Sequence, residues 1–124
     1  MDDLLKLGAR LLIAPLFLAG TVQKFVDPAM VEGLLADHGW WTGLIWPATL
    51  FNLAGALALL SGLWPRPVAL ALALYCAVTS IFHWIPGDGW QMSIFIKNWA
   101  IAGGLLGLAA AGPGRFVLAG AKGR

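Results

Sequence analysis

Hydrophobic residues fall into four long segments that contain few polar positions and are separated by short polar connections. The segments cover about residues 4–26, 45–63, 67–85 and 93–112. Each is close to the ~20 residues that a helix needs to cross ~30 Å of hydrocarbon at ~1.5 Å per residue. Proline and glycine mark the boundaries, as in Asp27-Pro28 and Gly112-Pro113-Gly114. The pattern predicts an all-α integral membrane protein built as a four-transmembrane-helix bundle.

A shorter apolar pattern lies between the first two spans. Its apolar residues recur at helical spacing: Met30, Val31, Leu34 and Leu35. Glu32 and Asp37 lie off this stripe, which predicts a short amphipathic helix in the membrane interface. An ordinary surface loop is the alternative. Within the first span, Pro15 predicts a kink, because proline lacks an amide donor and crowds the preceding turn.

Composition agrees with a membrane protein. The 124 residues are 60% hydrophobic and 11% charged, whereas soluble domains carry roughly 25% charged residues. The mean hydropathy is +0.80. The net charge of +2 comes from a few residues at the ends and in the loops, so it does not indicate a basic surface for binding nucleic acid. We therefore expect one transmembrane domain over residues 1–124, surrounded by the lipid bilayer.

Motifs that would identify a reaction are few. The single cysteine, Cys76, excludes an intrachain disulfide and a C-x-x-C redox pair. His38 and His83 belong to different segments and lack ligand spacing, so no metal site is expected. The chain also has no phosphate loop and no nucleophile–base motif. Catalytic residues therefore stay unassigned.

The positive residues predict the orientation in the membrane. Six of the eight lysines and arginines lie on one side of the predicted topology: Lys6, Arg10, Arg66, Arg115, Lys122 and Arg124. Lys24 and Lys97 lie towards the other side. Because cytoplasmic loops carry the excess of positive charge, we expect a multi-pass protein of the bacterial inner membrane with both termini in the cytoplasm. Trp64 is then the single tryptophan at the inner boundary.

Five polar residues inside the spans are the candidate ligand-binding residues: Lys24, Asn52, His83, Lys97 and Asn98. A charge in a span costs at least ~2.5–3.5 kcal/mol on insertion scales, so it usually marks a partner or a function. All five lie in the outer half of the predicted topology, where packed helices can gather them in one outward-opening pocket. Structural alternatives exist for each. The lysines can snorkel, His83 can bond a carbonyl, and Asn52 can link helices.

Periodicity predicts which helix faces turn inwards. One face of the first span carries Arg10, Phe17, Thr21 and Lys24. The third span places Tyr75, Thr79 and His83 four residues apart, with Cys76 and Ser80 beside them. The fourth span aligns Ser93, Lys97 and Gly104. Since polar stripes on apolar helices usually face other helices, we expect Lys97 to point into the bundle and to contact the second and third spans.

Several short motifs follow one another along the chain. They are Arg10-Leu11-Leu12, Phe17-Leu18, Lys24-Phe25-Val26-Asp27-Pro28, Gly62-Leu63-Trp64-Pro65-Arg66, Phe82-His83, Lys97-Asn98 and Gly112-Pro113-Gly114-Arg115. Their order and spacing resemble the DoxX family of small four-helix bacterial membrane proteins over nearly the whole chain. Some relatives look like membrane subunits of thiosulfate:quinone oxidoreductase. The resemblance therefore implies a membrane subunit or accessory of a quinone-linked oxidoreductase system of the thiosulfate or thiol type.

The chain departs from the family at Asn52, where relatives often have a glutamate. Asparagine keeps hydrogen bonding but cannot titrate or neutralise a lysine, so a proton-transfer role built on that acid is not expected. No intrinsic redox cofactor is expected, and quinone is the candidate ligand. The expected partners are other membrane protein subunits, with a homo-oligomer as a further candidate. The alternative function is a non-catalytic structural or assembly subunit of a larger membrane complex.

Overall fold

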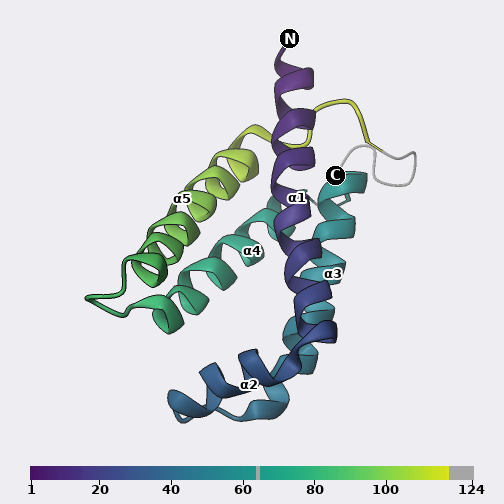
Figure 1. Cartoon of the computed structure of the whole chain (residues 1–124). Helices are drawn as coiled ribbons and strands as arrows, with labels where there is room; N and C mark the ends of the chain where they lie inside the picture. The colour runs from purple at the N-terminus through teal and green to yellow at the C-terminus, as the bar shows by residue number, and fades with distance from the viewer. Residues whose placement is uncertain (64, 118–124) are drawn as a thin grey trace.

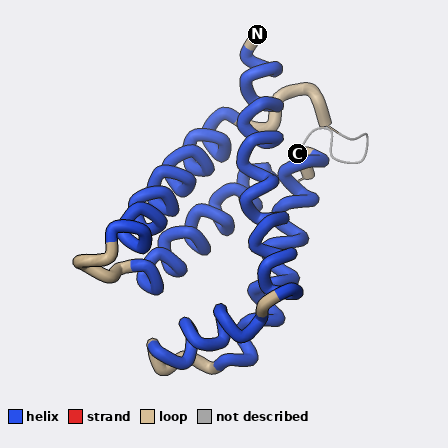
Figure 2. Tube along the Cα trace, in the orientation of Figure 1, coloured by secondary structure: helices blue, strands red, loops and turns tan. Residues whose placement is uncertain are grey.

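The chain folds into four long helices and several shorter ones (Figure 1). The structure, a computed structural model, describes residues 1–63 and 65–117. The long helices are α1 (Asp2–Val26), α3 (Ile45–Ser61), α4 (Pro65–Thr79) and α5 (Gly89–Ala111). A short helix, α2 (Pro28–Asp37), and two 3-10 turns, η1 (Thr42–Leu44) and η2 (Ser80–His83), complete the set. Figure 2 shows helices and connecting loops, with no strand in the part of the chain that is described.

Within the described residues, four helices are long and apolar enough to cross a membrane, when η1 is counted with α3 and η2 with α4. This confirms the predicted fold class. Large apolar side chains are exposed on all four, for example Leu12, Leu50, Leu74 and Ile96. Such exposure suits a protein whose outer surface faces lipid. Trp64, Lys122 and Arg124, which entered the sequence arguments, lie outside the described residues.

Capping explains where two of the helices begin and end. α5 begins at Gly89 rather than near Ser93, because the Asp88 carboxylate accepts hydrogen bonds from the backbone N–H of Trp90 (3.1 Å) and Gln91 (3.2 Å). α3 ends at Ser61 and is capped by Gly62, whose φ of +80° is a left-handed conformation that glycine adopts without strain. α1 continues across Pro15 without a break in its helical assignment.

The short helix predicted between the first two spans is confirmed as α2. Proline stands at its first turn, where a missing amide donor costs nothing. Leu35 is buried and forms a small apolar cluster with Ile45 and Phe82. α2 is therefore attached to the start of α3 and to η2, while its location in the membrane interface stays a prediction.

The long helices pack as two pairs, α1 with α3 and α4 with α5, and the pairs cross at an angle (Figure 1). A shared core joins the pairs and contains many small side chains, including Ala14, Ala56, Ala69 and Ala73. Small residues let helix backbones approach closely, which drives packing in membranes. The shared core therefore brings the inward faces of α1, α3, α4 and α5 together.

Candidate functional site

The structure divides the five candidate residues among three environments. Lys24 and Asn52 are buried, with exposed fractions of 7% and 2%. His83 and Asn98 are half-buried, and Lys97 is exposed. The prediction that the inward face of α1 carries Lys24 is confirmed, since Arg10, Phe17 and Thr21 on the same stripe are buried too.

Lys24 and Asn52 meet over the bare face of Gly20. A Cβ atom added to Gly20 would lie 3.1 Å from Asn52 Nδ2 and 3.5 Å from Lys24 Nζ. The Lys24 ammonium donates to the Gly20 carbonyl oxygen at 3.3 Å, which occupies one of its three donors. Asn52 Oδ1 is buried and has no hydrogen-bond partner within the described residues.

Tyr75 brings α4 to the same place. Its hydroxyl approaches the Asn52 amide, and its ring packs against Phe51 and Phe17 with centroids 5.2 Å and 6.5 Å away. Sequence reasoning did not name Tyr75 as a site residue, although the polar stripe of the third span contained it. We call Lys24, Asn52 and Tyr75 the polar cluster.

Other buried polar groups near the polar cluster are satisfied locally. The hydroxyls of Thr21, Thr49 and Ser80 donate to carbonyl oxygens of their own helical turns at 2.9, 2.6 and 2.6 Å. Such bonds within one helix are the usual way to bury serine and threonine in membrane spans. Asn52 Oδ1, by contrast, is buried and accepts no hydrogen bond within the described residues. Leaving a buried acceptor without a hydrogen bond costs ~1–3 kcal/mol.

His83 belongs to a separate arrangement at the end of η2. Its Nδ1 lies 2.7 Å from Oε1 of Gln91, in the first turn of α5. With Nδ1 donating to this oxygen, neutral His83 keeps Nε2 as an acceptor. The neighbouring Phe82 packs edge-on against the rings of His38 and Trp40, with ring centroids 4.7 Å and 5.2 Å apart. These contacts join η2 to the segment after α2.

The prediction that Lys97 points into the bundle is wrong. Lys97 is exposed, and so are Ser93 and Gly104, which share its stripe. The reason is the way α5 packs: its buried face carries Ala102, Leu105 and Leu108 against the core, so the Lys97 stripe is turned aside. Gly104 lies near α1: a Cβ atom added to Gly104 would be 3.8 Å from Cδ1 of Ile13.

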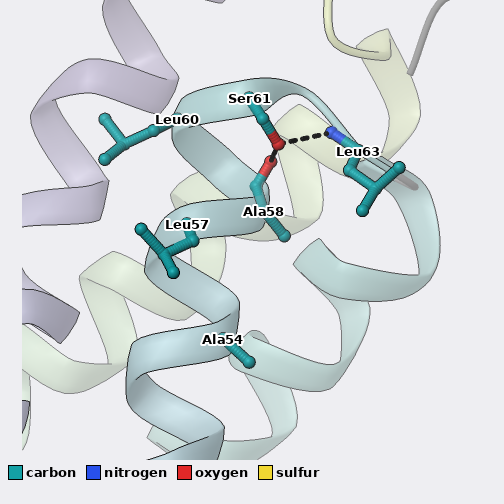
Figure 3. A pocket seen from close by; sticks show the side chains of 6 residues that line it. All are labelled: Ala54, Leu57, Ala58, Leu60, Ser61 and Leu63. Atoms are coloured by element: carbon teal, nitrogen blue, oxygen red, sulfur yellow. Dashed lines mark hydrogen bonds between the residues drawn. The ribbon is translucent and has the colours of Figure 1, made fainter. Parts of the chain in front are cut away.

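Two surface grooves are apolar and are not lined by any of the five candidate residues. One lies on the outer side of α3, next to Leu57, Ser61 and Leu63, and has a volume of about 450 Å³ (Figure 3). There the Ser61 hydroxyl donates to the Ala58 carbonyl oxygen and accepts from the Leu63 N–H. The other, of about 470 Å³, lies between α4 and α5 near Trp99. No group of three or more potential metal ligands occurs in the described residues.

Comparison with known proteins places the chain among its relatives. The family model described as DoxX matches residues 5–84, which is more than half of the chain. The chain belongs to the DoxX family. Inner membrane protein YqjF of Escherichia coli (strain K12) is similar, with 32% identity over 118 residues, covering 94% of this chain and 90% of that protein. No solved structure matches the chain.

Together with the four apolar helices, this relationship shows a multi-pass inner membrane protein of the DoxX family. The part of this DoxX protein that matches the family model contains the whole polar cluster and His83. Lys97 and Asn98 lie beyond it, on α5. Lys24 and Asn52 are therefore the most buried of the five candidate residues, and both lie within the matched segment.

Proposed function

We propose that this DoxX protein is a membrane subunit or accessory of a quinone-linked oxidoreductase system of the thiosulfate or thiol type. In this proposal the polar cluster binds an oxygen atom of the ligand, either a quinone carbonyl or an oxyanion. The observation that carries it is the buried Lys24 ammonium, which is bonded to one carbonyl and lies beside the Asn52 amide nitrogen across Gly20, so that two kinds of N–H donor come together. Supporting this, a buried cation without a counter-ion favours a ligand that supplies one.

Charge accounting supports the same proposal. The six acidic residues of the chain are Asp2, Asp3, Asp27, Glu32, Asp37 and Asp88. None lies in the middle of a span. Asp27, three residues after Lys24, is exposed at the C-cap of α1, whereas the Lys24 ammonium is bonded to the Gly20 carbonyl. Lys24 has two further donors, and an incoming oxygen acceptor can take them. The sequence has no redox-active cysteine pair, so we expect electrons to pass between bound substrates or to come from a partner protein.

A ligand titration tests this proposal. Purified protein in detergent is titrated with a short-chain ubiquinone analogue and, separately, with thiosulfate, while its tryptophan fluorescence is recorded. We expect Lys24→Met to lower the affinity for at least one of them about tenfold or more, the loss of ~1.4 kcal/mol that one charge-assisted hydrogen bond supplies. Methionine keeps the length and apolar volume of the stem.

Lys97→Met is the matched control, because it removes the same charge from an exposed position outside the polar cluster. We expect its affinity to equal that of the unsubstituted protein. Binding unchanged in Lys24→Met, or lost equally in both variants, would contradict the assignment of the ligand to the polar cluster.

A second function, a non-catalytic assembly subunit of a larger membrane complex, is favoured by a different observation. Lys97 is exposed on α5, and the two surface grooves are apolar rather than polar. A charge on a lipid-facing helix is expensive unless another subunit neutralises it. This function becomes the better one if neither ligand binds and Lys97→Met, but not Lys24→Met, removes co-purifying membrane proteins from native membranes.

A further inference from the structure

Arg10 is a buried cation whose hydrogen bonds go to backbone carbonyls. It lies on α1 with an exposed fraction of 1%. Its Nε donates to the Leu59 oxygen at 2.8 Å and its Nη2 to the Leu60 oxygen at 3.2 Å. Its Nη1 donates to the oxygens of Pro113 (3.0 Å) and Phe116 (2.8 Å). One guanidinium therefore joins α1, the end of α3 and the segment that follows α5.

The chemistry of these partners explains how the charge is tolerated. Leu59 and Leu60 lie in the last turn of α3, where carbonyls lack an intrahelical donor. The C-terminus of a helix also carries a partial negative charge, which favours a cation. The planar guanidinium presents five N–H groups, so it can serve several carbonyls at once, which a lysine cannot do in the same geometry.

The segment after α5, residues 112–117, runs back towards α1 and the end of α3, and we call it the C-terminal strap (Figure 1). Its Arg115 N–H donates to Oδ1 of Asp3 at 3.3 Å. A Cβ on Gly114 would lie 3.2 Å from the Lys6 Cβ, and a Cβ on Gly62 would clash with the Val117 side chain. The C-terminal strap therefore packs closely on both helices of the α1–α3 pair.

We propose that Arg10 and the C-terminal strap form a clasp that fixes the α4–α5 pair against the α1–α3 pair at this end of the molecule. The strap contributes carbonyl oxygens to Arg10, so its role depends on its path and not on the chemistry of its side chains. Arg10 is a positioning residue, far from the polar cluster along α1. The proposal stands independently of any ligand at that cluster.

A cross-link across the clasp tests the proposal. A Cβ at position 114 would lie 3.2 Å from the Lys6 Cβ, just below the about 3.5–4.5 Å found in disulfides. Because Gly114 has a φ of +79°, a cysteine there is strained, so the strap has to shift slightly for the bond to form. Lys6→Cys with Gly114→Cys is built in a Cys76→Ser background and oxidised after purification. We expect a disulfide to form, and its yield to fall when Arg10→Gln is added to the same cysteine pair.

Thermal unfolding in detergent then separates the clasp from a local effect on α3. We expect Arg10→Gln to lower the melting temperature in the reduced protein, and oxidation of the 6–114 pair to restore most of that loss. A melting temperature that stays low after the disulfide has formed would mean that Arg10 merely caps α3, and the clasp would be rejected. If the Arg10→Gln protein does not accumulate in the membrane, Arg10→Lys is used, since lysine keeps the positive charge and loses the planar set of N–H donors.

Arg66→Gln supplies the matched control. Arg66 also donates to a helix-end carbonyl, with Nε 3.2 Å from the Ala109 oxygen, but it is exposed and has no bond to the C-terminal strap in the described contacts. We expect its loss to lower the melting temperature less and to leave the cross-link yield unchanged. An equal fall in yield for Arg66→Gln and Arg10→Gln would overturn the specific role of Arg10.

Discussion

At the scale of single residues, the polar positions of this DoxX protein differ in how completely they are satisfied. Arg10 is buried and has four carbonyl partners. Lys24 is buried with one, and Asn52 Oδ1 has none within the described residues. Lys97 is exposed on the surface of α5. Burial of a charge is thus matched by acceptors at Arg10 but not in the polar cluster, which is why the latter is the better candidate for a ligand.

A substitution at Asn52 turns this difference into a prediction. In Asn52→Asp a carboxylate oxygen faces Lys24 whichever way the group turns, so the ammonium gains an internal partner. We expect the affinity for an anionic or carbonyl ligand to fall about tenfold or more, equivalent to ~1.4 kcal/mol. Asn52→Leu, which supplies no charge, is the comparison in the same fluorescence titration. Tighter ligand binding in Asn52→Asp than in Asn52→Leu would contradict the idea that Lys24 is the group that holds the ligand.

Some of these residue environments could be predicted from the sequence and others could not. Helical periodicity correctly predicted that Lys24 shares the buried face of α1, because one helix fixes which of its own residues lie together. The same reasoning failed for Lys97, because the inward face of α5 depends on the tilt and neighbours of the whole helix. The partners of Arg10 were not predictable, since carbonyls at Pro113 and Phe116 leave no pattern in the side chains.

At the scale of helices, the apolar segments predicted each long element, and caps set their ends. The start of α5 was expected about one turn too late, because hydrophobicity begins after the residues that Asp88 caps. The first turn of α5 also supplies Gln91, the partner of His83. The capping carboxylate therefore supports a contact between η2 and α5 as well as the helix itself.

Removing this cap should loosen the start of α5. We expect Asp88→Ala to cost ~0.5–2 kcal/mol, the usual effect of losing an N-cap acceptor. The measurement is hydrogen–deuterium exchange, in which peptides covering Trp90 and Gln91 should exchange faster. Asp88→Asn keeps a side-chain acceptor and should behave almost like the unsubstituted protein. Slow exchange in Asp88→Ala would show that packing, not the cap, holds this turn.

At the scale of the whole molecule, two helix pairs share a core of small residues and are surrounded by apolar side chains that suit lipid. The charge bias predicts that both termini lie in the cytoplasm. In that orientation the clasp lies at the cytoplasmic end, and the polar cluster lies towards the periplasm.

Single cysteines in a Cys76→Ser background test this orientation. We expect Asp37→Cys and Asp88→Cys to react with a membrane-impermeant maleimide added to intact spheroplasts. Arg115→Cys should react after the membrane has been permeabilised. These positions are exposed, so the membrane and not burial controls their reactivity. Labelling of Arg115→Cys in intact spheroplasts would reverse the predicted topology.

The sequence separation inside the clasp has a consequence for biosynthesis. Arg10 is 103 residues from Pro113 and 106 from Phe116. A ribosome therefore delivers the charged first span to the membrane long before those two carbonyls exist. Until the last helix has been inserted, the N–H groups that later bind the strap have to donate to water, lipid phosphates or the insertion machinery. Binding of Arg10 to the finished strap would then be one of the final events of assembly. In a chain that stops before residue 113, Arg10 would lack two of its four carbonyl acceptors.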